Sequence, residues 1–78
     1  MNLEILTPNK AVFNGEVSLV QLPGLDGLFE LLNNHAPMIS ALKNGKIKVT
    51  HSTGEISFFD IRGGIVEVLN NKVLVLAE

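Results

Sequence analysis

The sequence contains two histidines, the side chains best suited to acid–base or metal chemistry near neutral pH. His35 lies in a His-Ala-Pro corner, and His51 ends a segment of alternating apolar and polar residues. No His-x-His or His-x-x-x-His spacing occurs and there is no cysteine, so the chain offers no zinc ligand set. We interpret His51 as a solvated residue at the end of a strand. For His35 two interpretations stay open: a corner residue bonded to nearby backbone, and a contact at an interface.

The carboxylates are spread one to each predicted segment, whereas paired carboxylate chemistry needs two of them in one cleft. Asp60 and Arg62 share a face of an extended segment, and we expect a surface ion pair worth at most about 1 kcal/mol. Gly63-Gly64 lacks the Lys-Ser/Thr pair and the following helix of a phosphate-binding loop. We therefore predict no catalytic residue, no bound cofactor and no metal. The alternative is a small-molecule-binding or catalytic β-sandwich that uses His35, which would require a concave pocket around that residue.

Length and charge narrow the class of protein further. The 78 residues suffice for one domain, and the six scattered basic residues in a chain of net charge −2 argue against nucleic-acid binding. No apolar run approaches the roughly 18 residues of a membrane-spanning segment, so direct membrane insertion is not expected. The N-terminus has no basic region followed by a long apolar stretch, so no signal peptide is predicted.

Most of the chain has the pattern of short strands separated by turn residues. The clear strand segments are Leu3–Thr7, Ala11–Phe13, Glu16–Leu22, Lys46–His51, Glu55–Asp60, Ile65–Leu69 and Lys72–Leu76. Two further apolar segments, Leu28–Leu32 and Met38–Leu42, are too short for periodicity to separate strand from helix. Eight or nine short strands predict an all-β sandwich or barrel built from antiparallel sheets.

Turn residues predict where the strands end. Asn14-Gly15 is the strongest two-residue hairpin signal, and Pro23-Gly24 is expected to break the strand that precedes it. Further turns are predicted at Asp26-Gly27, Asn33-Asn34 and Asn70-Asn71, and the paired glycines at 63 and 64 suggest a bulge or a close backbone approach. The irregular stretch 23–45 is dense in such residues, and we expect it to present a surface.

Several runs of residues together resemble one known family. They are Leu3–Pro8, Val12–Val17, Asn34–Gly45, Gly63–Val68 and Val73–Glu78, and the combination of the His-Ala-Pro run with the Gly-Gly-x-x-Glu-Val run is specific. In order and spacing they resemble the N-terminal domain of the epsilon subunit of F-type ATP synthases, over essentially the whole chain, as a single domain of residues 1–78. The resemblance implies a ten-stranded antiparallel β-sandwich of two five-stranded sheets.

The resemblance also implies a mechanical rather than catalytic role. Members of this family bind the gamma subunit at the foot of the central stalk, rest on the loops of the c-ring, and help couple ion-driven rotation to ATP synthesis. The implied location is peripheral, on the cytoplasmic face of the bacterial plasma membrane or on the matrix or stroma side in an organelle.

Carried over to this sequence, the resemblance implies two sets of contact residues. The gamma-facing set would include Thr7, His35 and Ser40, with Val20 and Leu22 added because they alternate with Val17 and Leu19. Leu28 would lie near the tip of the c-ring-facing loop, although Leu28 and Glu30 depart from the common charge pattern there. That loop comprises Pro23, Gly24, Leu25, Asp26, Gly27, Leu28, Phe29 and Glu30.

Relatives in this family usually continue into a C-terminal helical hairpin that inhibits ATP hydrolysis and, in some bacteria, binds ATP. The present sequence ends at Glu78. We therefore expect this 78-residue chain neither to bind ATP nor to inhibit hydrolysis through such a hairpin.

Overall fold

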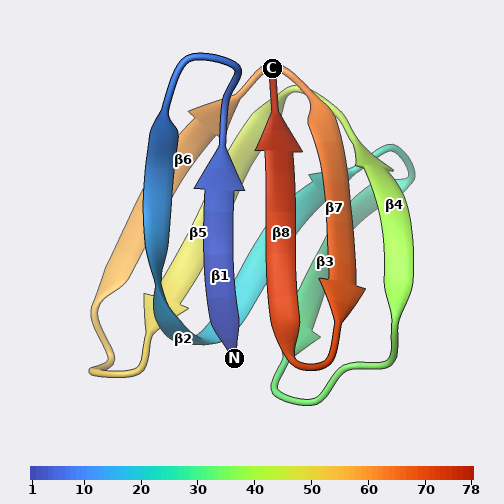
Figure 1. Ribbon diagram of the computed structural model, residues 1–78. Coiled ribbons are helices and arrows are strands. Elements are labelled where there is room, and N and C mark those ends of the chain that lie inside the picture. The colour runs from blue at the N-terminus through green and yellow to red at the C-terminus, as the bar shows by residue number, and fades with distance from the viewer.

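The computed structural model describes all of residues 1–78 and contains eight strands and no helix (Figure 1). The two segments whose pattern fitted either strand or helix are both strands, β3 and β4. The strands are β1 (Asn2–Leu6), β2 (Ala11–Gly24), β3 (Gly27–Leu32), β4 (Met38–Leu42), β5 (Gly45–His51), β6 (Ile56–Ile61), β7 (Gly64–Leu69) and β8 (Lys72–Ala77).

The strands form two layers that share one strand. The first sheet has the order β2–β1–β8–β7–β4, and the second sheet has the order β3–β2–β5–β6. The first half of β2 pairs with β1, and its second half lies between β3 and β5. The all-β sandwich prediction is confirmed. The strand count is eight rather than ten, and β1 pairs with β8 in parallel, so the sheets are not purely antiparallel.

The hairpin predicted at Asn14-Gly15 is wrong. Both residues lie within β2, opposite Glu4 and Leu3 of β1, and neither has a positive φ. The ladder to β1 thus outweighs the local turn preference. A Cβ added at Gly15 would come within 3.1 Å of the ring of Phe13, so the glycine makes room for that ring rather than for a turn.

The prediction that Val20 and Leu22 face away from Val17 is also wrong. The register of β2 against β5 shifts between Val17 and Leu19, and this bulge reverses the alternation of side chains. As a result Val17, Val20 and Leu22 are all fully buried. Neither Val20 nor Leu22 has surface to offer a partner, so both leave the predicted gamma-facing set.

The core between the two layers is entirely apolar. Sixteen buried apolar residues form one cluster, and no polar or charged residue is buried. Every strand contributes at least one aliphatic side chain to this core, and β3, β4 and β6 contribute one each, namely Leu31, Leu42 and Ile61. The lysines of β5 point outward as the alternation predicted, while Ile47 and Val49 are fully buried.

Two of the predicted turns are confirmed by the backbone geometry of their asparagines. Asn34 has φ 64°, and Asn70 and Asn71 have φ 51° and 61°, the left-handed region that asparagine tolerates. Gly64 confirms the expected close backbone approach: an added Cβ would overlap the carbonyl oxygen of Leu76 on β8. Asn70, Asn71 and Gly64 therefore determine how β7 pairs with β8.

Two predicted side-chain environments are wrong. Asp60 does not pair with Arg62; its carboxylate accepts a hydrogen bond from the Lys46 ammonium at 2.8 Å, because the two face each other across β5 and β6. His51 does end β5, as predicted, but it is half-buried rather than solvated. Its Nε2 lies 2.8 Å from the Ser57 hydroxyl, and its ring packs edge-on against Phe13 at 5.3 Å. His51 thus helps close the sandwich along one side.

Candidate partner-binding surfaces

Exposed apolar side chains are the most informative surface feature of the domain. Large contiguous apolar patches on a soluble domain mark contacts with other molecules. In this domain the exposed apolar side chains lie in three places: the turn between β2 and β3, the outer face of the first sheet, and the outer face of the second sheet. The exposed large residues are Leu25, Leu28, Leu32, Ile39, Ile56, Phe58, Ile65, Leu69 and Leu76.

The stretch predicted to face the c-ring is the tip of the hairpin β2–β3. Gly24 pairs with Gly27, so the loop itself is only Leu25 and Asp26. Gly27 has φ 128°, which a side chain would disfavour. Leu28 at the tip is 66% exposed. The hairpin therefore presents an apolar tip on a rigid pair of strands.

The expected strand break at Pro23-Gly24 does not occur, because both residues belong to β2. Both are also buried, so they support the tip rather than contact a partner. The Pro23 ring packs against the position where a Cβ on Gly45 would lie, and the Phe29 ring packs against Gly24 in the same way. Of the stretch Pro23–Glu30, the exposed side chains are those of Leu25, Asp26, Leu28 and Glu30.

His35 lies in the connection between β3 and β4. The backbone amide of Asn34 donates to Asn71 Oδ1 at 2.7 Å, and the His35 amide donates to the Leu32 carbonyl at 3.3 Å. The ring Nδ1 of His35 lies 2.7 Å from the Ala36 carbonyl oxygen. The ring is exposed, and none of the hollows on the surface is lined by it. The geometry thus matches a bonded corner residue and provides no pocket for the catalytic alternative.

The residues predicted to face gamma do not gather in one place. Thr7 bonds the Lys10 carbonyl at 3.2 Å and borders Leu76 at the end of β8, whereas the His35 corner bonds Asn71 just before β8 begins. In Figure 1 the β1–β2 connection lies beside the C-terminus, and the β3–β4 connection lies at the opposite end. Ser40 is half-buried and borders the hairpin tip instead.

A further surface was missed by the sequence reasoning: the outer face of the first sheet. The register places Leu6, Leu76, Ile65 and Ala41 in one row across β1, β8, β7 and β4. The next row is Glu4, Leu74, Glu67 and Ile39. The sequence signal is that β7 and β8 carry aliphatic residues at consecutive positions, which is typical of strands with both faces covered.

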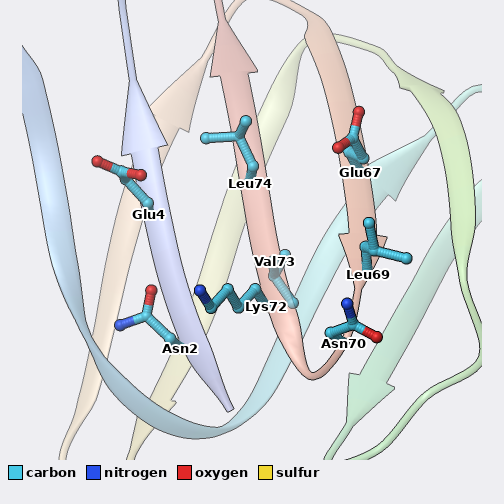
Figure 2. A pocket seen from close by; sticks show the side chains of 8 residues that line it. All are labelled: Asn2, Glu4, Glu67, Leu69, Asn70, Lys72, Val73 and Leu74. Carbon is cyan, nitrogen blue, oxygen red and sulfur yellow. The ribbon is translucent and has the colours of Figure 1, made fainter.

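Figure 2 shows a hollow on this face, where β1, β8 and β7 lie side by side. Its volume is about 340 Å³. Glu4 on β1 and Glu67 on β7 flank Leu74 on β8, and the Lys72 side chain extends toward β1 beside Asn2. No ion pair involves Glu4, Glu67 or Lys72. The hollow therefore combines an apolar floor with unpaired charges.

Neither metal ligation nor membrane spanning by a helix is supported. No three His, Asp or Glu side chains lie close enough together to hold a metal ion. The structure also has no helix of the length and apolarity needed to cross a membrane. The fold is that of a small β-sandwich, and its exposed apolar faces are the kind of surface that contacts other molecules.

Comparison with known proteins identifies the family. The family described as ATP synthase, Delta/Epsilon chain, beta-sandwich domain matches residues 1–78, and the chain belongs to it. The ATP synthase epsilon chain of Chlorobium limicola is 47% identical over 76 residues, covering 97% of this chain and 86% of that protein. The ATP synthase epsilon chain of Caulobacter vibrioides is 37% identical, covering 100% of this chain and 90% of that protein.

A solved structure shows the same fold. A chain in the cryo-EM structure of the Euglena gracilis mitochondrial ATP synthase superposes with a TM-score of 0.90 at 19% identity. The alignment covers 96% of this chain and 48% of that chain. The resemblance inferred from the sequence is therefore confirmed at the level of family and fold.

Proposed function

We propose that the chain is a non-catalytic rotor subunit of an F-type ATP synthase, at the foot of the central stalk. The observation that carries this proposal is the family match over residues 1–78, together with 47% identity to an ATP synthase epsilon chain. In this role the domain binds the gamma subunit and the c-ring, and so couples ion-driven rotation to ATP synthesis. It lies on the cytoplasmic side of the membrane, or on the matrix or stroma side in an organelle.

The structure supports a division of contacts between two regions. The hairpin tip, with Leu28 and Leu25 exposed, is suited to meet the loops of the c-ring. The His35 corner, tied to the β7–β8 turn through Asn71, is a rigid edge suited to the gamma subunit. Thr7 belongs to the opposite end of the sandwich, so a gamma contact that included it would have to extend along the first sheet.

The test of the proposal is complex formation with the gamma subunit of the same ATP synthase. The two should elute together on gel filtration at micromolar concentrations. Separate elution would contradict the stalk role, and turnover of a small molecule dependent on His35 would favour the catalytic alternative.

A Leu28→Asp variant tests the assignment of the hairpin tip. Because Leu28 is exposed, the variant should fold and still bind gamma, while ATP synthesis in reconstituted vesicles weakens several-fold. The matched control is Phe58→Asp, which changes an exposed apolar residue of β6 at the opposite edge of the second sheet and should leave both gamma binding and ATP synthesis unchanged. Loss of gamma binding in Leu28→Asp alone would assign the tip to gamma instead.

A further inference from the structure

We propose that Asn44 is a site of spontaneous covalent modification, at which the side-chain amide is converted to a carboxylate. Asn44 and Asn14 are the two asparagines of the chain that precede a glycine. Of these two, the structure leaves only Asn44 free to react. This inference concerns the chemistry of one turn and goes beyond the proposed function, on which it does not depend.

The reaction is a ring closure within the chain. The backbone nitrogen of the residue after asparagine attacks the side-chain carbonyl carbon, a C–N bond forms, and the side-chain nitrogen takes up the displaced proton and leaves as ammonia. Water then opens the five-membered imide at either carbonyl group, which gives aspartate or isoaspartate. A glycine after the asparagine favours the attack, because no Cβ hinders the nitrogen and the backbone turns freely.

At Asn14 the fold opposes this ring closure. Asn14 and Gly15 lie inside β2 and pair with β1, and the pairing continues on both sides of them. In an extended strand the side chain stands away from the next backbone nitrogen, so closure requires the ladder to open. The Phe13 ring also lies 3.1 Å from the position of an added Cβ on Gly15, and the Asn14 Oδ1 accepts a hydrogen bond from the Asn2 Nδ2 at 3.2 Å. Backbone and side chain are therefore both held in unreactive positions.

At Asn44 these constraints are missing. Asn44 lies between β4 and β5, belongs to neither strand, and is exposed. Gly45 is the first residue of β5 and pairs with Ile61. Ring closure therefore disturbs only the last pair of a ladder, where local opening costs little free energy.

The surroundings of Asn44 also suit the reaction and its product. Asn44 borders a surface hollow of about 500 Å³, which gives water access to the turn. Two cations, Lys46 and Arg62, and two acids, Asp60 and Glu78, line the same hollow. Lys46 is bonded to Asp60, whereas no ion pair involves Arg62. The Arg62 guanidinium is therefore available to a new carboxylate at position 44.

Isoaspartate at position 44 adds one carbon atom to the main chain between two residues that support the hairpin tip. The Lys43 amide donates to the Pro23 carbonyl at 2.8 Å, and Gly45 lies against the Pro23 ring. The longer link shifts Lys43 and Gly45 relative to each other and weakens this support. Hydrogen exchange at the Lys43 amide should accelerate at least about tenfold in the modified chain.

The experiment is incubation of the intact chain at mildly alkaline pH, followed by digestion after glutamate and mass spectrometry. Fragments 5–16 and 31–55 carry the two asparagine–glycine pairs separately, so Asn14 is an internal control. Residue 44 should gain the mass difference between an amide and a carboxylic acid at least about tenfold faster than residue 14. In the urea-unfolded chain the two residues should convert at similar rates, because the fold is the source of the difference.

Asn44→Gln is the matched variant, since the longer side chain forms the corresponding ring far more slowly. It should lack the mass change at position 44 and keep the original exchange rate of the Lys43 amide throughout the incubation. Conversion of Asn14 as fast as Asn44 in the folded chain would overturn the proposal. So would an unchanged residue 44 after a period that converts it in urea. Conversion without faster exchange at Lys43 would support the site and refute its effect on the hairpin tip.

Discussion

Gly64 offers the sharpest test of how the structure determines stability. The residue begins β7 and has φ 150°, a backbone conformation close to exclusive to glycine. A Cβ at this position would overlap the Leu76 carbonyl oxygen and lie 3.0 Å from the Ala77 Cα. Both obstacles are backbone atoms of β8, so no side-chain rotation can relieve the overlap. Gly64→Ala should therefore force β7 and β8 apart.

The expected loss in the free energy of unfolding is estimated by comparing Gly64 with two other glycines. Gly63 has φ 155°, but an added Cβ would lie at ordinary contact distances, 3.4 Å from the Leu42 carbonyl oxygen and 3.7 Å from the Glu78 carboxylate. Gly63→Ala should therefore lower the free energy of unfolding by the conformational strain alone, about 1–3 kcal/mol. Gly54 has φ 96° and no neighbour within 4 Å, so Gly54→Ala measures the strain in an open turn.

Gly64→Ala adds displacement of a paired strand to that strain, and we expect a loss of at least about 4 kcal/mol. A domain of 78 residues has a free energy of unfolding of about 4–12 kcal/mol. The variant should therefore be close to unfolded at room temperature or lose a large part of its stability.

The assay is urea unfolding followed by far-ultraviolet circular dichroism, since the chain has no tryptophan or tyrosine for fluorescence. The three variants are compared at equal m-values, so that differences in midpoint report stability. A Gly64→Ala loss within about 0.5 kcal/mol of the Gly63→Ala loss would refute the overlap argument.

Two further predictions concern burial and turn geometry. Leu31→Ala should lower the free energy of unfolding, measured in urea, by about 2–5 kcal/mol because Leu31 is fully buried. Leu32→Ala, on the outer side of β3, should lower it by less than about 1 kcal/mol. Equal losses would mean that Leu31 does not face the core as described. Asn71→Gly keeps the positive φ but loses the Oδ1 acceptor for the Asn34 amide, so it should lower the free energy of unfolding by about 1 kcal/mol. Asn71→Ala should lower it further, because alanine disfavours φ 61°. If thermal unfolding gave the reverse order, a left-handed backbone at this turn would be excluded.

Much of the fold was predictable because most strands are bounded by residues with local backbone preferences. The asparagine pairs at 33–34 and 70–71 define turns through positive φ, and the alternation of Lys46–His51 identified its buried face correctly. The family resemblance independently implied a β-sandwich. These features depend on near neighbours in the sequence, which a single sequence displays.

The errors arise where distant strands decide the outcome. Asn14-Gly15 has the strongest local turn signal, yet pairing with β1 keeps it extended. The bulge near Ser18 depends on the register between β2 and β5, which reverses the facing of Val20 and Leu22. Asp60 pairs with Lys46 rather than Arg62 for the same reason, since cross-strand neighbours are set by register. Register between remote strands leaves no trace in the local pattern.

The candidate surfaces were predictable only in part. The hairpin tip was identified from its glycines and its family resemblance. The outer face of the first sheet was not, because Glu4 lies far along the chain from the β7–β8 hairpin that carries Glu67 and Leu74, and it joins them only through the parallel pairing of β1 with β8.

The long strand β2 has a mechanical consequence. Its second half ends at the exposed hairpin tip, and its first half forms the edge of the first sheet. A force applied at the tip therefore reaches the first sheet along one extended covalent backbone, and not only through the apolar contacts between layers. Sliding one layer over the other would require β2 to stretch or to break its ladder to β1. In the proposed rotor role, this arrangement would let the two layers resist shear together when a partner pulls on the hairpin tip.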